Sequence, residues 1–451
     1  MWRQTSIIVT LTVVLQILTA VNGYQLPNGG KIWALLVAGS NGFDNYRHQA
    51  DICHAYQILH RNGIPDENIV VMMYDDIAYA HSNLDPGVII NQPNGPNVYE
   101  GVPKDYTGET VNSTNFLKIL SGDEKGMEGV GSGRVIKSGP KDHIFVNFVD
   151  HGATGLLAFP DLSGQNLYAP ELLKTFQQMA AKKTVFKTLV MYVEACESGS
   201  MFDGILPTDL NELVSLLSFV KMRQSSYACY YDPELGTYLG DFFSVLWMQD
   251  SEKENLVREM IHQQFEIVRT ETNTSHVEEY GDLVIGSLHV SEFLGYRPSP
   301  PENKRPLPAI NMNEVVSSRD VPLGILKMKK HARSSEEREH YAFHIQRMTK
   351  SRKHLEKIVS QILLMASGYD VNKVEHLKNM NYKLKLEDYD CYKALVSLFS
   401  EECFKISENA YALSQLKYFA NICGDGDVQM ASALIAIKNI CTFEETMNGV
   451  D

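Results

Sequence analysis

Blocks of apolar and polar positions alternate over the first two thirds of the chain. Polar stretches that suit helices, such as residues 46–63, separate four apolar, β-rich runs, at residues 32–39, 68–74, 143–149 and 188–193. Continuous apolar strands separated by helices are typical of a mainly parallel sheet that is covered on both faces. The pattern therefore predicts an α/β fold between about residues 31 and 290, with ligands at the carboxyl ends of the strands.

The chain changes character near residue 295. The Pro-rich residues 295–308 predict an extended linker, and apolar residues then return at helical spacing, as in residues 354–366. We expect four segments: a signal peptide at 1–23, an α/β domain at 24–294, a linker region at 295–324 and a helical domain at 325–451.

The first residues have the pattern of a secretory signal peptide. Arg3 precedes an apolar core at about residues 7–18, and the small residues Val21 and Gly23 suit a cleavage site. An uncleaved membrane anchor is the alternative, which the short apolar core disfavours. No later run is long enough to span a bilayer, and the glycosylation sequons at Asn112 and Asn273 weakly support passage through the secretory route.

Charge is distributed unevenly along the chain. The formal net charge of -14 argues against general nucleic-acid binding, because phosphate contacts require a basic face. Residues 327–357 hold ten Lys or Arg and four Asp or Glu, so this segment carries +6 and the remainder carries -20. We expect the basic segment to cover an acidic surface of the same chain.

The seven cysteines fall into two groups. Two disulfides, with three possible pairings, are the economical interpretation of the four that crowd into the last 61 residues: Cys391, Cys403, Cys423 and Cys441. Cys53 and Cys229 are either buried thiols or a third pair, which leaves Cys196 over. We find no CxxC pair and no HExxH motif, so the sequence predicts neither a metal site nor a cofactor.

Two apolar runs end in residues suited to nucleophilic catalysis. His151 and Cys196 each follow a predicted strand, and Gly152 beside the histidine lets a substrate carbonyl approach the backbone. His151 can act as base and then as acid, while the N–H groups of Gly152 and Cys196 hold an oxyanion. A lone histidine or cysteine is more often structural. Their joint placement at strand ends predicts a catalytic pair.

Several motifs, in their order along the chain, resemble the legumain family of asparaginyl endopeptidases. They are residues 40–78, "FVDHGATG" at 148–155, "YVEACESGSM" at 192–201, "SSYACYYD" at 225–232 and "TYLGD" at 237–241. The resemblance implies a caspase-like α/β catalytic domain and a helical, death-domain-like pro-domain. It also implies cleavage of peptide bonds after Asn, and after Asp at low pH.

The resemblance assigns roles to single residues. Cys196 would be the nucleophile, His151 the base, and Asn45 the residue that orients the histidine. Asp150 matches a residue that is linked to peptide ligase activity through a succinimide. The specificity pocket would be lined or supported by Arg47, His48, Glu194, Ser225, Ser226 and Asp241. An Asn side chain has one acceptor and two donors, so a cation opposite carboxylates suits it; a surface salt-bridge cluster is the alternative interpretation of these charges.

Partners and compartment also follow from the resemblance. It implies disulfides Cys391–Cys423 and Cys403–Cys441, inhibition by the chain's own pro-domain, Asn-containing substrates and cystatin-type inhibitors. It implies secretion or delivery to an acidic compartment such as the lysosome. We expect the basic residues 327–357 to form a lid over the pocket carboxylates that acid releases.

Two features depart from the family pattern. Residues 211–225 are longer and more apolar than expected, which favours a catalytically impaired homologue that binds peptides or inhibitors as the alternative. No Asn follows residues 325–340, where related proenzymes are cut, so the possible activation sites are Asn303, Asn311, Asn313 and Asp320. A transamidase that attaches lipid anchors is a further alternative, but a membrane-spanning tail would be expected of it.

Overall fold

The computed structural model describes residues 24, 26–160, 165–182, 185–207, 210, 214–218, 224–272, 277–296, 308–331, 334–406 and 409–443. The predicted signal peptide, the sequon at Asn273 and the possible activation site Asn303 lie outside these residues.

A six-stranded sheet forms the centre of the α/β part, in the order β11-β8-β7-β3-β1-β2. Its strands are β1 Ile32–Ala38, β2 Ile69–Met72, β3 His143–Val149, β7 Thr188–Glu194, β8 Val214–Ser218 and β11 Glu278–Gly281. β11 pairs antiparallel with β8, and the other neighbours pair in parallel. The four apolar runs of the sequence supply β1, β2, β3 and β7, so the predicted α/β fold is confirmed.

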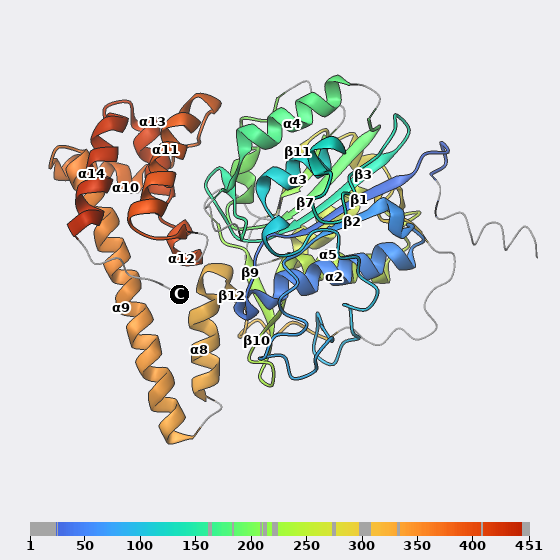
Figure 1. Cartoon of the computed structure of the whole chain (residues 1–451), viewed down its shortest axis with the longest axis horizontal. Helices are drawn as coiled ribbons and strands as arrows, with labels where there is room; N and C mark the ends of the chain where they lie inside the picture. Colours follow the sequence, from blue (N-terminus) through green and yellow to red (C-terminus); the bar gives the residue numbers. More distant parts are fainter. Residues whose placement is uncertain are drawn as a thin grey trace, which may run out of the picture.

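Helices cover both faces of this sheet (Figure 1). α2 Tyr46–Arg61 and α5 Phe242–Lys253 share one core with Ala34 and Leu36 of β1. α3 Ser113–Leu120 and α4 Ala169–Ala181 share the other core with Leu35 and Val37. Alternate side chains of β1 therefore enter opposite cores, which explains why the strand is apolar at every position.

A second, three-stranded sheet lies beside the carboxyl ends of β3 and β7. Its order is β10-β9-β12, with β9 Tyr227–Asp232, β10 Thr237–Asp241 and β12 Val316–Ser317. Both neighbours pair antiparallel with β9. β12 comes from the region predicted as a linker, so part of that region is a strand against the α/β part.

The C-terminal part is helical and lies beside the α/β part (Figure 1). Its longer helices are α8 Val321–His331, α9 Ser335–Ala366, α10 Val371–Asn379, α11 Tyr389–Glu402, α13 Lys417–Asp425 and α14 Met430–Phe443. α9 begins at a capping box between Ser334 and Glu337. The basic residues 327–357 form the end of α8 and most of α9. Within the described chain, no helix has the length and apolar character needed to cross a membrane.

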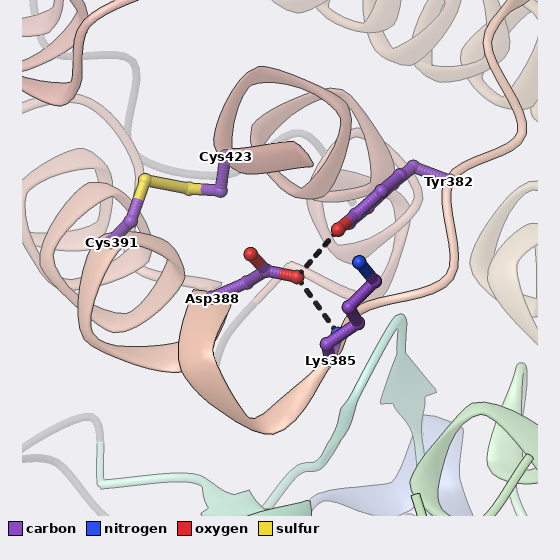
Figure 2. The surroundings of a disulfide bond; sticks show 5 residues. All are labelled: Tyr382, Lys385, Asp388, Cys391 and Cys423. Carbon is purple, nitrogen blue, oxygen red and sulfur yellow. Dashed lines mark hydrogen bonds between the residues drawn. A yellow bond between two sulfur atoms is a disulfide. The ribbon is translucent and has the colours of Figure 1, made fainter. Parts of the chain in front are cut away.

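Two disulfides stabilise the C-terminal helices. Cys391–Cys423 joins α11 to α13, and Cys403–Cys441 joins the end of α11 to α14, the two pairs that the resemblance implies. Figure 2 shows Asp388, just before α11, accepting hydrogen bonds from the Tyr382 hydroxyl at 2.9 Å and the Lys385 N–H at 2.8 Å. These two hydrogen bonds therefore hold the turn that precedes α11 and the first disulfide. Cys53 and Cys229 are buried free thiols rather than a third pair.

Candidate active site

The predicted catalytic pair lies at one edge of the main sheet. β3 and β7 pair in parallel with Val149 opposite Glu194, so both strands end at the same level. His151 and Cys196 each follow two residues later. The structure therefore brings these two side chains to neighbouring strand ends, the place where ligands bind in parallel sheets.

One nitrogen of the His151 ring makes a hydrogen bond, and the other has no partner. Its Nε2 lies 2.9 Å from Oδ1 of Asn45, the residue before α2. Asn45 Nδ2 donates to the Asn41 carbonyl at 2.9 Å, so its Oδ1 faces the ring and Nε2 must donate. Nδ1 then carries the lone pair, and it is buried without a hydrogen-bond partner. Burial, with Arg47 and Arg319, lowers the His151 pKa to about 3, so the ring is a neutral base here.

Cys196 is buried and its sulfur faces Ser226. Sγ lies 3.3 Å from the Ser226 backbone nitrogen, which donates to it, and 3.4 Å from the Ser226 hydroxyl. Gly152 passes close to the Cys196 backbone, because a Cβ on Gly152 would come within 2.4 Å of the Cys196 carbonyl oxygen. Only glycine allows this approach. The backbones next to the base and next to the thiol are therefore in contact, as the predicted oxyanion site requires.

The predicted pocket residues form one buried, charged cluster. Arg47 Nε donates to Asp241 Oδ1 at 2.9 Å, and its Nη1 donates to the Asp44 carbonyl at 3.0 Å. Glu194 Oε2 accepts from the backbone N–H and the hydroxyl of Ser244, at 2.9 and 3.2 Å. Arg47, Glu194 and Asp241 each expose 0% of their surface, which makes a surface salt-bridge cluster the wrong interpretation.

Three atoms of this cluster have no hydrogen-bond partner: Arg47 Nη2, Glu194 Oε1 and Asp241 Oδ2. His48 Nε2 lies 3.4 Å from the same Asp241 oxygen. Buried polar groups in proteins are normally paired, so three unpaired ones in a single cluster indicate a place prepared for a polar ligand. The ligand would need one acceptor for the guanidinium and two donors for the carboxylates.

The pocket contains one further carboxylate that the sequence analysis missed. Asp51 lies one turn after Arg47 on α2 and accepts the Asp241 backbone N–H at 3.1 Å and Asn91 Nδ2 at 2.7 Å. Burial and then Asp241 raise the pKa of both Asp51 and Glu194 well above their usual values. Burial also raises the Asp241 pKa, while Arg47 opposes this effect. The spacing of four residues between Arg47 and Asp51 was the signal that could have identified it.

Residues 316–320 lie across the site. β12 extends the antiparallel pairing of β9 up to Ser226, where the Ser318 N–H donates to the Ser226 carbonyl at 2.9 Å. The Ser318 hydroxyl lies 2.9 Å from the Ser226 hydroxyl and 3.5 Å from Asp241 Oδ1. Ser318 is 1% exposed. A serine side chain therefore occupies the mouth of the charged pocket, and its sequence context gave no signal of this position.

The next two residues fix this segment to both parts of the chain. Arg319 Nη2 donates to Glu197, the residue after Cys196, at 2.5 Å. Arg352 on α9 pairs with Asp320 and donates to the Arg319 carbonyl at 3.0 Å. The covering segment is thus anchored on one side by the α/β part and on the other by the C-terminal helices.

The remaining predicted sites lie apart from the pocket. Asn311 and Asn313 are exposed in a turn just before β12, and Asp320 is held by Arg352. Asn112 caps α3 by accepting the Asn115 N–H at 2.9 Å. Ser225 directly precedes Ser226 and is half-buried. Of residues 211–225, only 214–218 and 224–225 are described; they include β8, which pairs in parallel with β7.

Two lysines outside the basic residues 327–357 form ion pairs between the two parts of the chain. Lys383 pairs with Asp203 at 2.6 Å, and Lys393 pairs with Glu171. Both lysines lie outside the basic segment. A net charge counted along the chain cannot indicate which face of a long helix meets the partner, and here much of α9 faces solvent.

The last predicted site residue, Asp150, lies between the base and the pocket. It is 1% exposed. Burial raises its pKa well above the usual value, with the His151 N–H and Arg47 partly opposing this effect. His48, Asp150 and His151 each offer one metal-ligating atom, and the three atoms lie within 4.8 Å of one another. His48 lies on α2, whereas Asp150 and His151 follow β3. These residues are far apart along the chain, so no local sequence motif indicates the group.

Two family models match this chain. The model described as "Peptidase C13 family" matches residues 32–296, and the model described as "Legumain, prodomain" matches residues 343–441. The boundary between the two matches falls in the region that contains β12 and α8.

Individual relatives match along most of the chain. Legumain of Mus musculus is 47% identical over 401 residues, which cover 88% of this chain and 89% of the mouse protein. Legumain of Homo sapiens is 46% identical, with 88% and 90% covered. The vacuolar-processing enzyme beta-isozyme of Arabidopsis thaliana is 41% identical over 416 residues, with 88% and 83% covered.

Proposed function

Because this chain belongs to the peptidase C13 family of cysteine endopeptidases and carries a legumain prodomain, we propose that it cleaves peptide bonds on the carboxyl side of asparagine. The three unpaired atoms of the pocket carry this proposal. The amide oxygen of an Asn side chain accepts from Arg47 Nη2, and its two N–H bonds donate to Glu194 Oε1 and Asp241 Oδ2. An Asn side chain therefore satisfies all three atoms at once.

The same pocket explains cleavage after Asp at low pH. An ionised Asp would bring a third negative charge toward Glu194 and Asp241, which costs free energy in a buried site. A protonated Asp is neutral and has an O–H that can donate to one of these carboxylates. Cleavage after Asp is therefore restricted to acidic conditions, whereas cleavage after Asn is not limited in this way.

We assign the chemistry to the residues at the strand ends. The Cys196 thiol gives its proton to His151 Nδ1 and attacks the substrate carbonyl, while the N–H groups of Gly152 and Cys196 stabilise the oxyanion. His151 then protonates the leaving amine, and a water molecule hydrolyses the thioester. Asn45 holds the ring so that Nδ1 faces the reaction. Attack by another peptide's amine in place of water would give ligation, and Asp150 is placed to influence that balance.

The C-terminal part acts as the inhibitor of the proposed zymogen. Ser318 reaches the pocket with its hydroxyl 3.5 Å from Asp241 Oδ1, but it has no side-chain amide to join Arg47, Glu194 and Asp241. We infer that residues 316–320 block the site until cleavage and acid release them in a lysosome-like compartment or after secretion. Cleavage at exposed Asn311 or Asn313, at Asn303, or after Asp320 would serve. Cystatin-type inhibitors would compete for the same pocket.

One feature favours a second function, that of an impaired homologue which binds peptides without cutting them. Residues 211–225 are more apolar than the family pattern. Against this, β8 keeps its parallel place beside β7. The site residues themselves are complete, so we regard hydrolysis as the function.

Reporter peptides distinguish the two functions. The protein is incubated at acidic pH with peptides that differ only in Asn, Asp or Ala at the cleavage position. We expect cleavage after Asn, weaker cleavage after Asp that disappears toward neutral pH, and none after Ala. The Cys196→Ser variant should fold and be inactive. Absence of cleavage and of labelling by an active-site thiol probe would support the impaired homologue.

A further inference from the structure

Three side chains beside the proposed base converge on one point. The ligating atoms of His48, Asp150 and His151 lie within 4.8 Å of one another. His48 Nδ1 is 3.7 Å from Asp150 Oδ1, and the two imidazole rings have centroids 5.0 Å apart. Ligands of a tetrahedral zinc ion lie about 3.4 Å apart, given metal–ligand distances of about 2.0–2.1 Å. Small side-chain rotations would bring these three groups to that spacing.

The hydrogen bonds of His151 leave one of its lone pairs free. His151 Nε2 donates to Asn45 at 2.9 Å, which leaves the lone pair on the unpartnered Nδ1. His48 Nδ1 lies 2.6 Å from the Ser40 hydroxyl, and His48 Nε2 lies 3.4 Å from Asp241 Oδ2. Metal-binding histidines have this arrangement, in which a second acceptor fixes the ring and its tautomer.

Asp150 gives an independent indication of a ligand. It is 1% exposed, and its carboxylate oxygens make no hydrogen bond to a side chain. The His151 backbone N–H and Arg47 compensate only part of its burial, and a carboxylate at this depth is costly because burial removes the water that would solvate it. A cation between Asp150 and the two rings would replace the favourable interaction with water that the carboxylate loses on burial.

The surrounding charges favour a cation as well. Four buried carboxyl groups, Asp51, Asp150, Glu194 and Asp241, lie in and beside the pocket, and two guanidinium groups, Arg47 and Arg319, lie near His151.

We propose that His48, Asp150 and His151 form a binding site for a divalent transition-metal cation of the zinc type. Two imidazoles and one carboxylate are ligands that zinc accepts, with a fourth position open to water. The cation would occupy the lone pair of His151 Nδ1, so the ring could no longer accept the Cys196 proton. This inhibitory consequence rests on the proposed function, whereas the binding of metal does not.

Equilibrium dialysis of the full chain against buffered free zinc tests the site. We expect one zinc ion per wild-type chain and at least about a tenfold weaker affinity for Asp150→Asn, since even indirect partners of a metal matter on that scale. Two control variants should bind as the wild type does. Asp85→Asn changes an exposed carboxylate, and His340→Gln removes one ring of an exposed pair on α9 whose centroids lie 4.5 Å apart. Equal binding by Asp150→Asn, or loss of binding in His340→Gln, would overturn the proposal.

A cobalt spectrum provides a second test that does not depend on the folding of a variant. Wild-type protein loaded with Co²⁺ should show visible d–d bands without a thiolate charge-transfer band, and Cys196→Ser should give the same spectrum. A thiolate band that Cys196→Ser removes would place the metal on the nucleophile and exclude this site. Failure of the proposed function would be seen separately, as absent peptide cleavage in metal-free buffer.

Discussion

A single oxygen, Oε1 of Glu194, would distinguish side chains in the proposed function. Oε2 is engaged by Ser244, whereas Oε1 is buried and unpaired. Glu194→Gln keeps the size and can keep one contact to Ser244, but it places an N–H₂ group where the substrate amide donates. An unsatisfied buried polar pair costs about 1–3 kcal/mol, so kcat/KM for Asn peptides should fall by about 5- to 150-fold.

Steady-state kinetics of the activated variant measure this loss. Glu109→Gln, a change at an exposed carboxylate outside the pocket that accepts from Tyr74, serves as the matched control and should leave kcat/KM unchanged. If Glu194→Gln cleaves Asn peptides as efficiently as the control, then Glu194 does not accept from the substrate.

The sequence supports some of these residue positions better than others. His151 and Cys196 could be predicted because each ends an apolar strand, and parallel strands bring their ends together. Asp51 was missed, although its spacing from Arg47 on α2 was available. The unpaired state of Asp150 could not be predicted, because it depends on the packing of Gly39, whose Cα lies against the Asp150 carboxylate so that a Cβ there would approach it to 2.4 Å.

At the scale of elements, β12 determines whether the site is open. Its antiparallel pairing with β9, and the Ser318 N–H that donates to the Ser226 carbonyl, hold Ser318 at the pocket. Ser318→Asn would provide the amide that the three unpaired atoms lack. We expect the variant zymogen to cut itself at acidic pH between residues 318 and 319, a bond that the wild type leaves intact.

Intact-mass spectrometry over a time course detects the new fragments. Ser318→Ala is the matched control, because it changes the same position without adding an amide, and it should not be cut there. The double variant Ser318→Asn with Cys196→Ser should also remain whole. Persistence of the 318–319 bond in the active variant would mean that residues 316–320 do not lie as a substrate does.

The elements differ in how far the sequence could predict them. The strands of the main sheet follow from continuous apolar runs. β12 has no such signal, because two residues become a strand only through their pairing with β9. The start of α8 at Val321 likewise could not be predicted within the linker region at 295–324, since Pro322 suits the first turn of a helix as well as a linker.

For the whole molecule, buried carboxyl groups make stability depend on pH. Glu259 is 7% exposed and both its oxygens are unpaired. Burial, and then Asp250, raise its pKa to about 8 from 4.5. The folded state therefore holds a proton that the unfolded state has lost, so this stabilisation is complete below pH 4.5 and is lost as pH rises through 8. Glu259→Gln imitates the protonated acid, so this variant should lose less stability as pH rises.

Thermal unfolding at pH 5 and pH 8, in a Cys196→Ser background that prevents self-cleavage, tests this prediction. The melting temperature of the parent should fall more between pH 5 and pH 8 than the melting temperature of Glu259→Gln does. Glu67→Gln, at an exposed carboxylate elsewhere on the α/β part, should behave as the parent. Identical losses in all three proteins would show that Glu259 is ionised throughout this range.

In the proposed function, the whole molecule serves the recognition of one side-chain amide. The most direct test is the ratio of kcat/KM for two peptides that differ only in Asn or Leu at the cleavage position, because Leu has the same branched shape without polar atoms. A site that hydrogen-bonds its substrate rejects such an analogue by about 10⁴- to 10⁵-fold. We predict a ratio of that size for the activated enzyme at acidic pH; a ratio near one would contradict the account.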